Sequence, residues 1–588
     1  MVNKILNILD KSHLKYFLIL FFLYIPVTIL ETIGISSLPV FVIFITQPDN
    51  FNDYFSNFEF IRIIENLTVY ERTFYGSIIV GLIFLIKGSA TLLLGYFEVY
   101  LNKITVKDIS SKLYKKYLGN EYYFHIENEP PKLIQNINDV NRVTAIIFSL
   151  LTLLKEAFLI FTVVAILFFS DPKTFSIVFG LLSLPLLIYY LLLRNVLKNQ
   201  GNIAKKYRDI SLREMTQGFA GIKLVKLLNK EGFLQQSFSL NFSKALHYDM
   251  FVRFLAKVPR VFLEILSVGT ILILMIIFVR NGKSFNEFLP LLTFVVVATV
   301  RLIPSFGNIV VSLNLIRFHS VTLDNIYNSL KYKSYIQKNK NLQKVKNINL
   351  KQKNNFLKID SVNFQYPNKK ENIIHNLSLK IDKGSIIGIT GSSGSGKTTL
   401  IDIILGLLKP NKGKIINNGK NIEDNLKNWS KRIGYVPQTV NLINDSIKRN
   451  ICYGHKDIAI DKKLLASCIK FSELERFVNI LPKKLNTNIG HLGKKISGGQ
   501  LQRIGVARAL YQNPELLILD EATNALDIRT EAKLIKNLRK FKSKLTIILI
   551  SHRISVLKNC NKIFIIEDGN IKFKGSYKNF SKNKFLQK

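Results

Sequence analysis

A glycine-rich stretch, GSSGSGKTTL, lies between a short run of β-branched residues and an apolar run with helical spacing. Its spacing, Gly391-x-x-x-x-Gly396-Lys397-Thr398, is typical of a phosphate-binding loop between a strand and a helix. Glycines let backbone N–H groups converge on phosphate oxygens, because no Cβ stands in the way. The positively charged Lys397 would bind the β- and γ-phosphates of a nucleotide, and the Thr398 hydroxyl would bind Mg²⁺. The alternative is a glycine-rich loop at the start of an ordinary helix.

Two further stretches argue against that alternative. The sequence LLILDEAT places two acids, Asp520 and Glu521, directly after four aliphatic residues that are typical of a buried strand. We expect Asp520 to hold the shell of a magnesium ion and Glu521 to orient or deprotonate an attacking water. The sequence ISGGQLQR, residues 496–503, precedes this strand. Together the three stretches predict an ATP-hydrolysing site.

With these motifs in this order, the second half of the chain resembles the nucleotide-binding domain of ABC transporters. The resemblance implies an adenine-stacking aromatic at Tyr366, a Q-loop glutamine at Gln438 and a switch histidine at His552. It assigns Asp520 to Walker B and Glu521 to the catalytic glutamate. The remaining nucleotide contacts implied by the resemblance are the Walker A residues Gly391, Ser392, Ser393, Gly394, Ser395, Gly396, Lys397, Thr398 and Thr399, the signature residues Ser497, Gly498, Gly499 and Gln500, and the D-loop residue Asp527.

The resemblance also implies cofactors and roles. ATP and Mg²⁺ are the expected cofactors, with the metal held by Thr398, Gln438 and Asp520. Glu521, His552, Gln438 and Lys397 are the expected catalytic set. In this family the signature motif of one subunit closes on ATP held by Walker A of another. One chain is therefore catalytically incomplete, and we expect a homodimer, although a heterodimer with a related chain is an alternative.

Three positions depart from the family pattern. Ile496 begins the signature where leucine is usual, and Asn524 begins the D-loop where serine or threonine is usual. His491 stands where exporters usually carry a glutamate that senses the membrane half, which leaves communication between the halves in doubt. No catalytic position is lost.

The first half of the chain is apolar enough to span a membrane. A span needs roughly 20 mostly apolar residues, and six segments qualify: 16–45, 74–101, 143–169, 173–193, 251–279 and 286–312. Lysines and arginines cluster after the second and fourth spans, whereas the connection 46–73 is rich in acids. By the positive-inside rule, the N-terminus, the long segments 102–142 and 194–250 and the second half are cytoplasmic.

The predicted fold is an all-α transmembrane domain of six helices, residues 1–325, a linker, 326–354, and an α/β P-loop domain, 355–588. Chain order resembles the type IV ABC exporters, so the expected location is the cytoplasmic membrane, with the lipid bilayer as a partner. The formal net charge of +42 raises the question of nucleic acid, but the lysines are scattered and no reading helix is present, so we expect no nucleic-acid partner. Three scattered cysteines argue against a disulfide framework.

Two kinds of segment between the spans are also predicted to be helical. In the long cytoplasmic segments, residues 121–134 and 217–228 are placed to act as coupling helices, as in exporters. Residues 53–67 carry aromatics and isoleucines at roughly helical spacing. That segment is either a helix along the outer leaflet or an ordinary loop helix packed on the spans.

Charged residues inside the spans suggest what is moved. Lys87 is the only charged residue between Phe74 and Phe97, Arg260 lies near the start of span five and Arg301 lies midway along span six. Such residues cost about 2.5–3.5 kcal/mol each at the bilayer centre, so they are either paired internally or functional. In a homodimer they would place six cations around one cavity, which suits a pyrophosphate.

A second resemblance points the same way. ETIGISSLP, VPRVFLE and RLIPSFGNI, together with the aromatic outer helix, are similar to the PglK-type flippases of lipid-linked oligosaccharides. In that family, cavity arginines engage the pyrophosphate, and here Lys87 replaces an arginine. The resemblance implies an anionic lipid-linked substrate, flipped at the expense of ATP. An exporter of lipid, peptide or drug-like molecules is the alternative.

Overall fold

The computed structural model describes residues 1–46, 68–170, 172–280, 285–331, 355–367, 369, 371–490, 496–541 and 545–581. The chain divides into two compact units: the first comprises Met1–Asn120 and Phe124–Gln337, and the second comprises Glu121–Tyr123 and Lys338–Lys588. The predicted outer helix at 53–67 and His491 lie outside the described residues.

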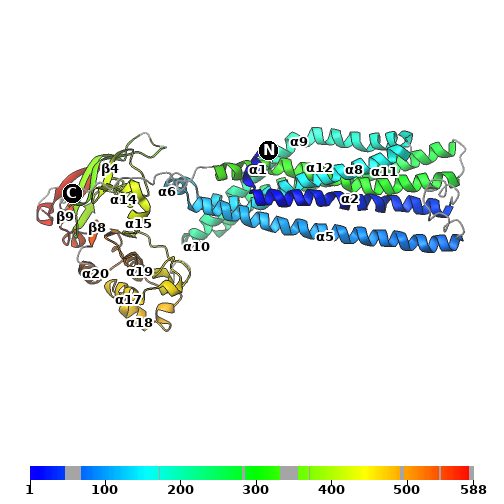
Figure 1. Ribbon diagram of the computed structural model, residues 1–588. Helices are drawn as coiled ribbons and strands as arrows, with labels where there is room; N and C mark the ends of the chain where they lie inside the picture. The colour runs from blue at the N-terminus through cyan, green and yellow to red at the C-terminus, as the bar shows by residue number, and fades with distance from the viewer. Residues whose placement is uncertain are drawn as a thin grey trace. The chain divides into compact units, whose positions relative to one another are not determined.

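The first unit is entirely helical where it is described, and its long helices run side by side (Figure 1). The six predicted spans each fall within one long helix of the described chain, and short helices lie in the predicted coupling segments. The helices are α1 (Val2–Ile8), α2 (Lys11–Thr46), α5 (Val69–Leu118), α6 (Tyr122–Glu127), α7 (Pro130–Asn138), α8 (Val140–Ser170), α9 (Pro172–Ala220), α10 (Ile222–Leu228), α11 (Glu231–Arg280) and α12 (Phe285–Lys331).

Within the described residues, three helical stretches are long and apolar enough to cross a membrane: Lys11–Thr46, Val69–Leu118 and Pro130–Ala165. The other three predicted spans lie on α9, α11 and α12, where many side chains are outside the described part. α12 continues to Lys331, beyond the predicted domain boundary at 325. The reason is that helices of this unit extend well past the apolar segment, as α5 and α9 also do.

Local sequence explains the start of α5. Thr68 caps the helix: its hydroxyl accepts a hydrogen bond from the backbone N–H of Glu71, and the Glu71 carboxylate accepts one from the backbone N–H of Thr68. This reciprocal capping box satisfies N–H groups that have no partner within the helix. Gly119 follows the last residue of the helix.

A buried charged cluster joins the polar ends of these helices. Asp139, only 1% exposed, accepts a hydrogen bond from Arg142. Arg208 of α9 pairs with Asp249 of α11 at 3.1 Å. Lys205 is buried nearby, and burial lowers its pKa. Removing one partner of such a cluster leaves an uncompensated buried charge, so it fixes how the helices pack.

The second unit has two sheets. An antiparallel sheet has the order β2-β1-β4-β5, and a six-stranded sheet has the order β10-β9-β3-β8-β7-β6. β3 pairs in parallel with β8 and β9, β7 with β8 and β6, while β10 is antiparallel to β9. The strands are β1 (Asn355–Phe364), β2 (Ile374–Asp382), β3 (Ile386–Thr390), β4 (Lys412–Asn417), β5 (Lys420–Asn421), β6 (Ile433–Val436), β7 (Leu516–Asp520), β8 (Thr546–Ile550), β9 (Lys562–Glu567) and β10 (Asn570–Gly575).

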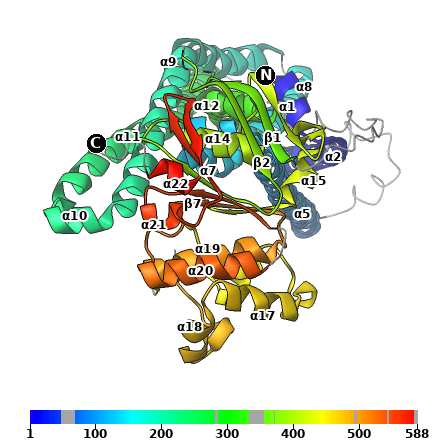
Figure 2. The same ribbon diagram turned by 90° about the vertical axis from the view of Figure 1, so that its left-hand side faces the viewer.

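Helices pack around these sheets, and Figure 2 shows α17, α18, α19 and α20 gathered into one group. β7 and β8 are buried along their whole length, which explains their unbroken aliphatic sequence. The three cysteines of this unit are buried free thiols. The helices are α14 (Lys397–Leu405), α15 (Leu426–Ser430), α16 (Ile447–Ile451), α17 (Lys462–Phe471), α18 (Glu475–Ile480), α19 (Gly498–Tyr511), α20 (Ile528–Phe541), α21 (Ile554–Leu557) and α22 (Tyr577–Phe580), with 3₁₀ turns η2 (Ile422–Asn425), η3 (Asp457–Ala459) and η4 (Lys484–Asn486).

A close backbone approach between two helices of the first unit predicts a packing-sensitive position. A Cβ at Gly201 of α9 would lie 2.2 Å from the backbone oxygen of Phe318 on α12. We expect Gly201→Ala to force the helices apart and to destabilise the unit by about 1–3 kcal/mol. The measurement is the melting temperature of the purified protein in detergent. Gly81→Ala is the control, because a Cβ at Gly81 meets no described heavy atom within 4 Å. Equal melting temperatures for both variants would contradict the close packing.

Candidate functional site

The phosphate loop, His552, the acids Asp520 and Glu521, and Gln438 lie at the carboxyl ends of four neighbouring strands, β3, β8, β7 and β6. The register aligns these ends: Ile389 lies opposite Ile550, Ile550 opposite Asp520, and Leu519 opposite Val436. Parallel strands in register deliver their next residues to one edge of the sheet. Ligands of open α/β sheets bind at this edge.

The glycine-rich loop leaves β3 with two positions that only glycine fits. A Cβ at Gly391 would lie 2.0 Å from the backbone oxygen of Ile566 in β9. Gly396 has a φ of 95°, in the left-handed region that favours glycine, and α14 begins at the next residue. The loop is therefore a fixed turn that opens a helix N-terminus towards solvent.

Lys397 is buried and folds back over this loop. Its ammonium donates to the backbone oxygens of Gly391 and Ser392, at 2.9 and 2.6 Å. Burial lowers the pKa of Lys397, while the nearby carboxylates of Glu521 and Asp520 act in the opposite direction. The lysine thus closes the loop and supplies a positive charge at its centre.

The other loop residues differ in exposure. Thr398, the predicted metal ligand, is exposed, and so are Ser392, Ser393 and Gly394, whereas Ser395 and Thr399 are buried. Tyr366 is half-buried, with its hydroxyl 3.5 Å from the hydroxyl of Thr399. The predicted adenine-stacking ring therefore lies beside the helix that the phosphate loop opens.

Three side chains converge on Glu521. One carboxylate oxygen accepts hydrogen bonds from the amide of Gln438, at 2.8 Å, and from the amide of Asn524, at 3.0 Å. The other lies 3.3 Å from Nε2 of His552. Glu521 itself has a φ of 49°, a backbone conformation uncommon for a residue with a side chain. Such strain clusters at functional sites, and here it sits on the predicted catalytic base.

Asp520 occupies the last position of β7 and is 8% exposed. The Tyr435 hydroxyl donates a hydrogen bond to its carboxylate at 3.4 Å. Burial, and then the adjacent Glu521 carboxylate, raise the pKa of Asp520. Because a cation beside this carboxylate would offset its lost hydration, the position is suited to a metal ligand.

The signature residues begin α19. The Ser497 hydroxyl accepts a hydrogen bond from the backbone N–H of Gln500, and the Gln500 side chain accepts one from the backbone N–H of Ser497. Ser497 and Gly498 are exposed, and Gly499 and Gln500 are partly exposed. The capping box fixes the start of α19 through contacts within the helix itself. The exposed Ser497 and Gly498 therefore remain accessible to another molecule.

The D-loop, Asn524–Asp527, connects several of these parts. Asp527 is exposed, and hydrogen bonds to its carboxylate from the side chain of Thr530, and then from the backbone N–H of Thr530, lower the Asp527 pKa. The backbone N–H of Ala525 donates to Gln502 of α19 at 3.0 Å. Sequence reasoning placed Asn524 at the start of the D-loop without predicting its contact with Glu521, and it missed Gln502 and Arg553 as site residues. The signal for Arg553 was its place directly after His552.

Of the predicted substrate residues, Lys87 is the one whose side chain the structure describes. It is half-buried on α5, alongside Gly34 of α2, with its ammonium 4.8 Å from the centre of the Phe84 ring. The side chains of Arg260 and Arg301 lie outside the described part. Elsewhere in this unit the side-chain amide of Asn308 on α12 donates a hydrogen bond at 2.8 Å to the buried carboxylate of Glu156 on α8.

Comparisons with known families decide the assignment. The model of the ABC transporter family matches residues 374–524, and that of the ABC transporter transmembrane region matches residues 17–302. The two matches place an ABC transporter transmembrane region and an ATP-binding cassette, in that order, on one chain. The chain belongs to the ABC exporters.

Two of the relatives cover more than four fifths of this exporter, and a third covers a shorter part of it. A putative export ATP-binding/permease protein of Rickettsia typhi is 29% identical over 83% of this chain and 84% of its own. An ATP-dependent lipid A-core flippase of Syntrophus aciditrophicus is 26% identical over 84% of this chain and 81% of its own. A probable multidrug resistance transporter of Bacillus subtilis is 38% identical over 38% of each chain.

A solved structure has the same fold. It is a bacterial Atm1-family ABC exporter with ATP bound, with a TM-score of 0.78 and 17% identity over 98% of both chains. The predicted fold class, a helical transmembrane domain followed by an α/β nucleotide-binding domain of the type IV kind, is confirmed. This exporter is therefore an ATP-driven transporter in which ATP hydrolysis is coupled to transport. As a half-transporter, it carries one membrane region and one cassette, which implies dimerisation.

Replacement of the predicted base tests the site. We expect Glu521→Gln to bind ATP as the parent does but to hydrolyse it about 10²–10⁴-fold more slowly, because an amide cannot accept the proton of the attacking water. The measurement is ATPase activity alongside nucleotide binding by the purified exporter. Glu475→Gln, on the exposed surface of α18, is the matched control. Parental turnover in Glu521→Gln would overturn the choice of base.

A second prediction concerns pH. Burial, and then the charge of Asp520, raise the pKa of Asp402 on α14 to about 6. Between pH 4 and 6 the folded state then binds more protons than the unfolded state, so stability falls as the pH rises. We expect Asp402→Asn to melt at a higher temperature than the parent above pH 6, and the difference to vanish near pH 4. Melting curves of the nucleotide-free exporter measure this, and a difference that does not change with pH would contradict it.

Proposed function

We propose that this exporter works as a homodimer that flips a polyprenyl-pyrophosphate-linked oligosaccharide, or a similar anionic glycolipid, across the cytoplasmic membrane. Residues 1–325 form its transmembrane domain, 326–354 a linker, and 355–588 the nucleotide-binding domain, which lies in the cytoplasm. The observation that carries the substrate assignment is Lys87, the only charged residue between Phe74 and Phe97 on an otherwise apolar stretch of α5.

The catalytic assignment is supported by the convergence on Glu521. Glu521 acts as the base for the attacking water, His552 and Gln438 orient it, and Lys397 neutralises phosphate charge. Contacts of 2.8 and 3.3 Å to Gln438 and His552 place these groups within reach of one another. Tyr366, the Walker A residues 391–399, the signature residues 497–500 and Asp527 bind the nucleotide.

The homodimer is supported by the signature of α19. Ser497 and Gly498 are exposed at a helix N-terminus, where backbone N–H groups attract anions. In the same chain, the phosphate loop precedes a different helix, α14. A second copy brings its signature to this loop, so two copies give two complete sites.

The residues present fit a magnesium ion. Thr398, Gln438 and Asp520 offer a hydroxyl, an amide and a carboxylate, the hard oxygen donors that this ion prefers. The raised pKa of the buried Asp520 fits a carboxylate that gains from a cation nearby. When bound, the ion would neutralise phosphate charge and polarise the bond that breaks.

The substrate assignment follows from electrostatics in a medium of low dielectric. Lys87 has a fixed place at the helix pair α2–α5, next to Gly34, and a lysine here attracts phosphate as a point charge. Arg260 and Arg301 complete the proposed set of cations. The lipid A-core flippase among the relatives supports a lipid as the class of substrate.

A second candidate is a drug-like hydrophobic substrate, which the multidrug resistance relative favours. It would require no cation in the cavity, because apolar molecules gain little from a fixed charge. The two candidates therefore differ in how transport depends on Lys87 and Arg301.

Flipping of a pyrophosphate-linked glycolipid in proteoliposomes tests the proposal. We expect Lys87→Ala and Arg301→Ala to lower substrate affinity by roughly 10- to 100-fold, the loss of one charge-assisted contact of about 1.5–3 kcal/mol. Basal ATPase activity should stay at the parental level. Lys103→Ala, an exposed lysine on the same helix, is the control.

Two outcomes would contradict the proposal. If both variants flip the glycolipid at the parental rate, the cations do not bind the substrate. If the parent moves a neutral apolar dye but not the glycolipid, a drug-like hydrophobic substrate replaces the glycolipid as the proposed substrate.

A further inference from the structure

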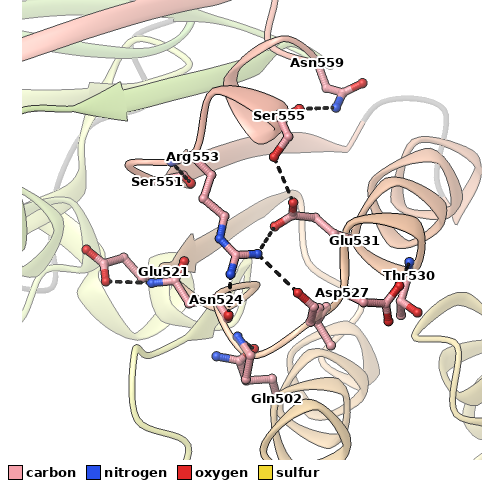
Figure 3. Close-up of polar contacts among 12 residues, drawn as sticks. Gln502, Glu521, Asn524, Asp527, Thr530, Glu531, Ser551, Arg553, Ser555 and Asn559 are labelled. Atoms are coloured by element: carbon pink, nitrogen blue, oxygen red, sulfur yellow. Dashed lines mark hydrogen bonds and ion pairs between the residues drawn. The ribbon is translucent and has the colours of Figure 1, made fainter. Parts of the chain in front are cut away.

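Arg553, the residue after His552, reaches across to the D-loop (Figure 3). Its guanidinium donates to the backbone oxygen of Asn524 at 2.7 Å and to that of Leu526 at 3.2 Å. The same group lies 3.6 Å from the carboxylate of Glu531 on α20, which is 2% exposed. One side chain thus holds two carbonyls of one loop and faces a buried carboxylate.

The chemistry of these contacts suits arginine. A guanidinium is a planar fork of five donors and can bond two carbonyls and a carboxylate at once, whereas an ammonium is a single point. Glu531 accepts a hydrogen bond from Ser555 at 3.1 Å, and Arg553 supplies a positive charge beside it. The buried carboxylate in turn holds the guanidinium in place, because an unpaired buried charge is costly.

The loop that Arg553 holds contacts the catalytic carboxylate. The backbone oxygen of Asn524 accepts from Arg553, and the side chain of the same residue donates to Glu521 at 3.0 Å. The side-chain oxygen of Gln502 on α19 accepts a hydrogen bond from the backbone N–H of Ala525, the residue that follows Asn524. The position of the Asn524 amide is therefore set by Arg553 on one side and by the signature helix on the other.

We propose that Arg553 is a positioning residue for catalysis: it fixes the D-loop so that the Asn524 amide orients Glu521 for the attacking water. Glu521 needs such support because its backbone has a φ of 49°, so no regular strand geometry sets the direction of its side chain. Arg553 acts through Asn524, whose backbone oxygen its guanidinium binds. The inference rests on the proposed role of Glu521 as the base.

ATP hydrolysis by the full-length exporter in lipid nanodiscs tests this. We expect Arg553→Ala to lower kcat by about 10- to 100-fold, the usual cost of a misplaced catalytic group, with less than a twofold change in KM. Arg553→Lys, which keeps a charge beside Glu531 but loses the fork, should recover only part of kcat. Arg476→Ala, an exposed arginine of α18, is the matched control and should keep the parental kcat.

A double-variant cycle separates positioning from general destabilisation. If Arg553 acts through the Asn524 amide, Arg553→Ala combined with Asn524→Ala should lose no more kcat than the worse single variant. Multiplied losses, an unchanged kcat in Arg553→Ala, or a raised KM alone would overturn the inference. If Arg553→Ala fails to fold, the same cycle is run with Arg553→Lys.

The premise is tested separately. Parental turnover in Glu521→Gln would remove the proposed base itself and the inference with it. Abolished turnover in Glu521→Gln together with parental turnover in Arg553→Ala would refute the role of Arg553 alone.

Discussion

The parallel register of four strands is the constraint on which the candidate site depends. Ile389, Ile550 and Asp520 lie opposite one another in β3, β8 and β7, and Val436 of β6 lies opposite Leu519. Because parallel pairing fixes the ends of these strands at one edge, the phosphate loop, the two acids, the switch histidine and the Q-loop leave the sheet together. A shift of one residue in one strand would turn its side chains to the other face and separate these groups.

In the second unit, side chains from several loops meet at Glu521. Its carboxylate contacts Gln438, Asn524 and His552, which come from three different loops. The backbone strain at Glu521 is tolerated because these contacts over-determine the side chain. The D-loop extends the same network to Arg553 and to Gln502 of α19, so the Glu521 carboxylate and the exposed signature are linked through a few hydrogen bonds.

The first unit follows different rules. Its long helices pack through close backbone approaches, such as Gly201 against Phe318, and through buried charges at their polar ends. The cationic character of Lys87 stands out against an apolar stretch of α5, where a charge is costly unless it is partnered or used. Coupling of ATP hydrolysis to transport requires that such helices have more than one stable packing, as two-state elements do in other switching proteins.

The sequence alone determined the order of the domains and the six long helices, because both depend on local pattern. The nucleotide-site residues came largely from the resemblance of the motifs to a family, and their roles stay predictions. Apolar length predicts a span, and a glycine-rich turn between strand and helix predicts a phosphate loop. It did not reveal that Asn524 would contact Glu521, that Arg553 would hold Asn524, or that α12 would run to Lys331. The tertiary structure decided these features. The contacts depend on which loops follow neighbouring strands, and the length of α12 depends on the helices packed against it. Neither can be predicted from the spacing of residues along one segment.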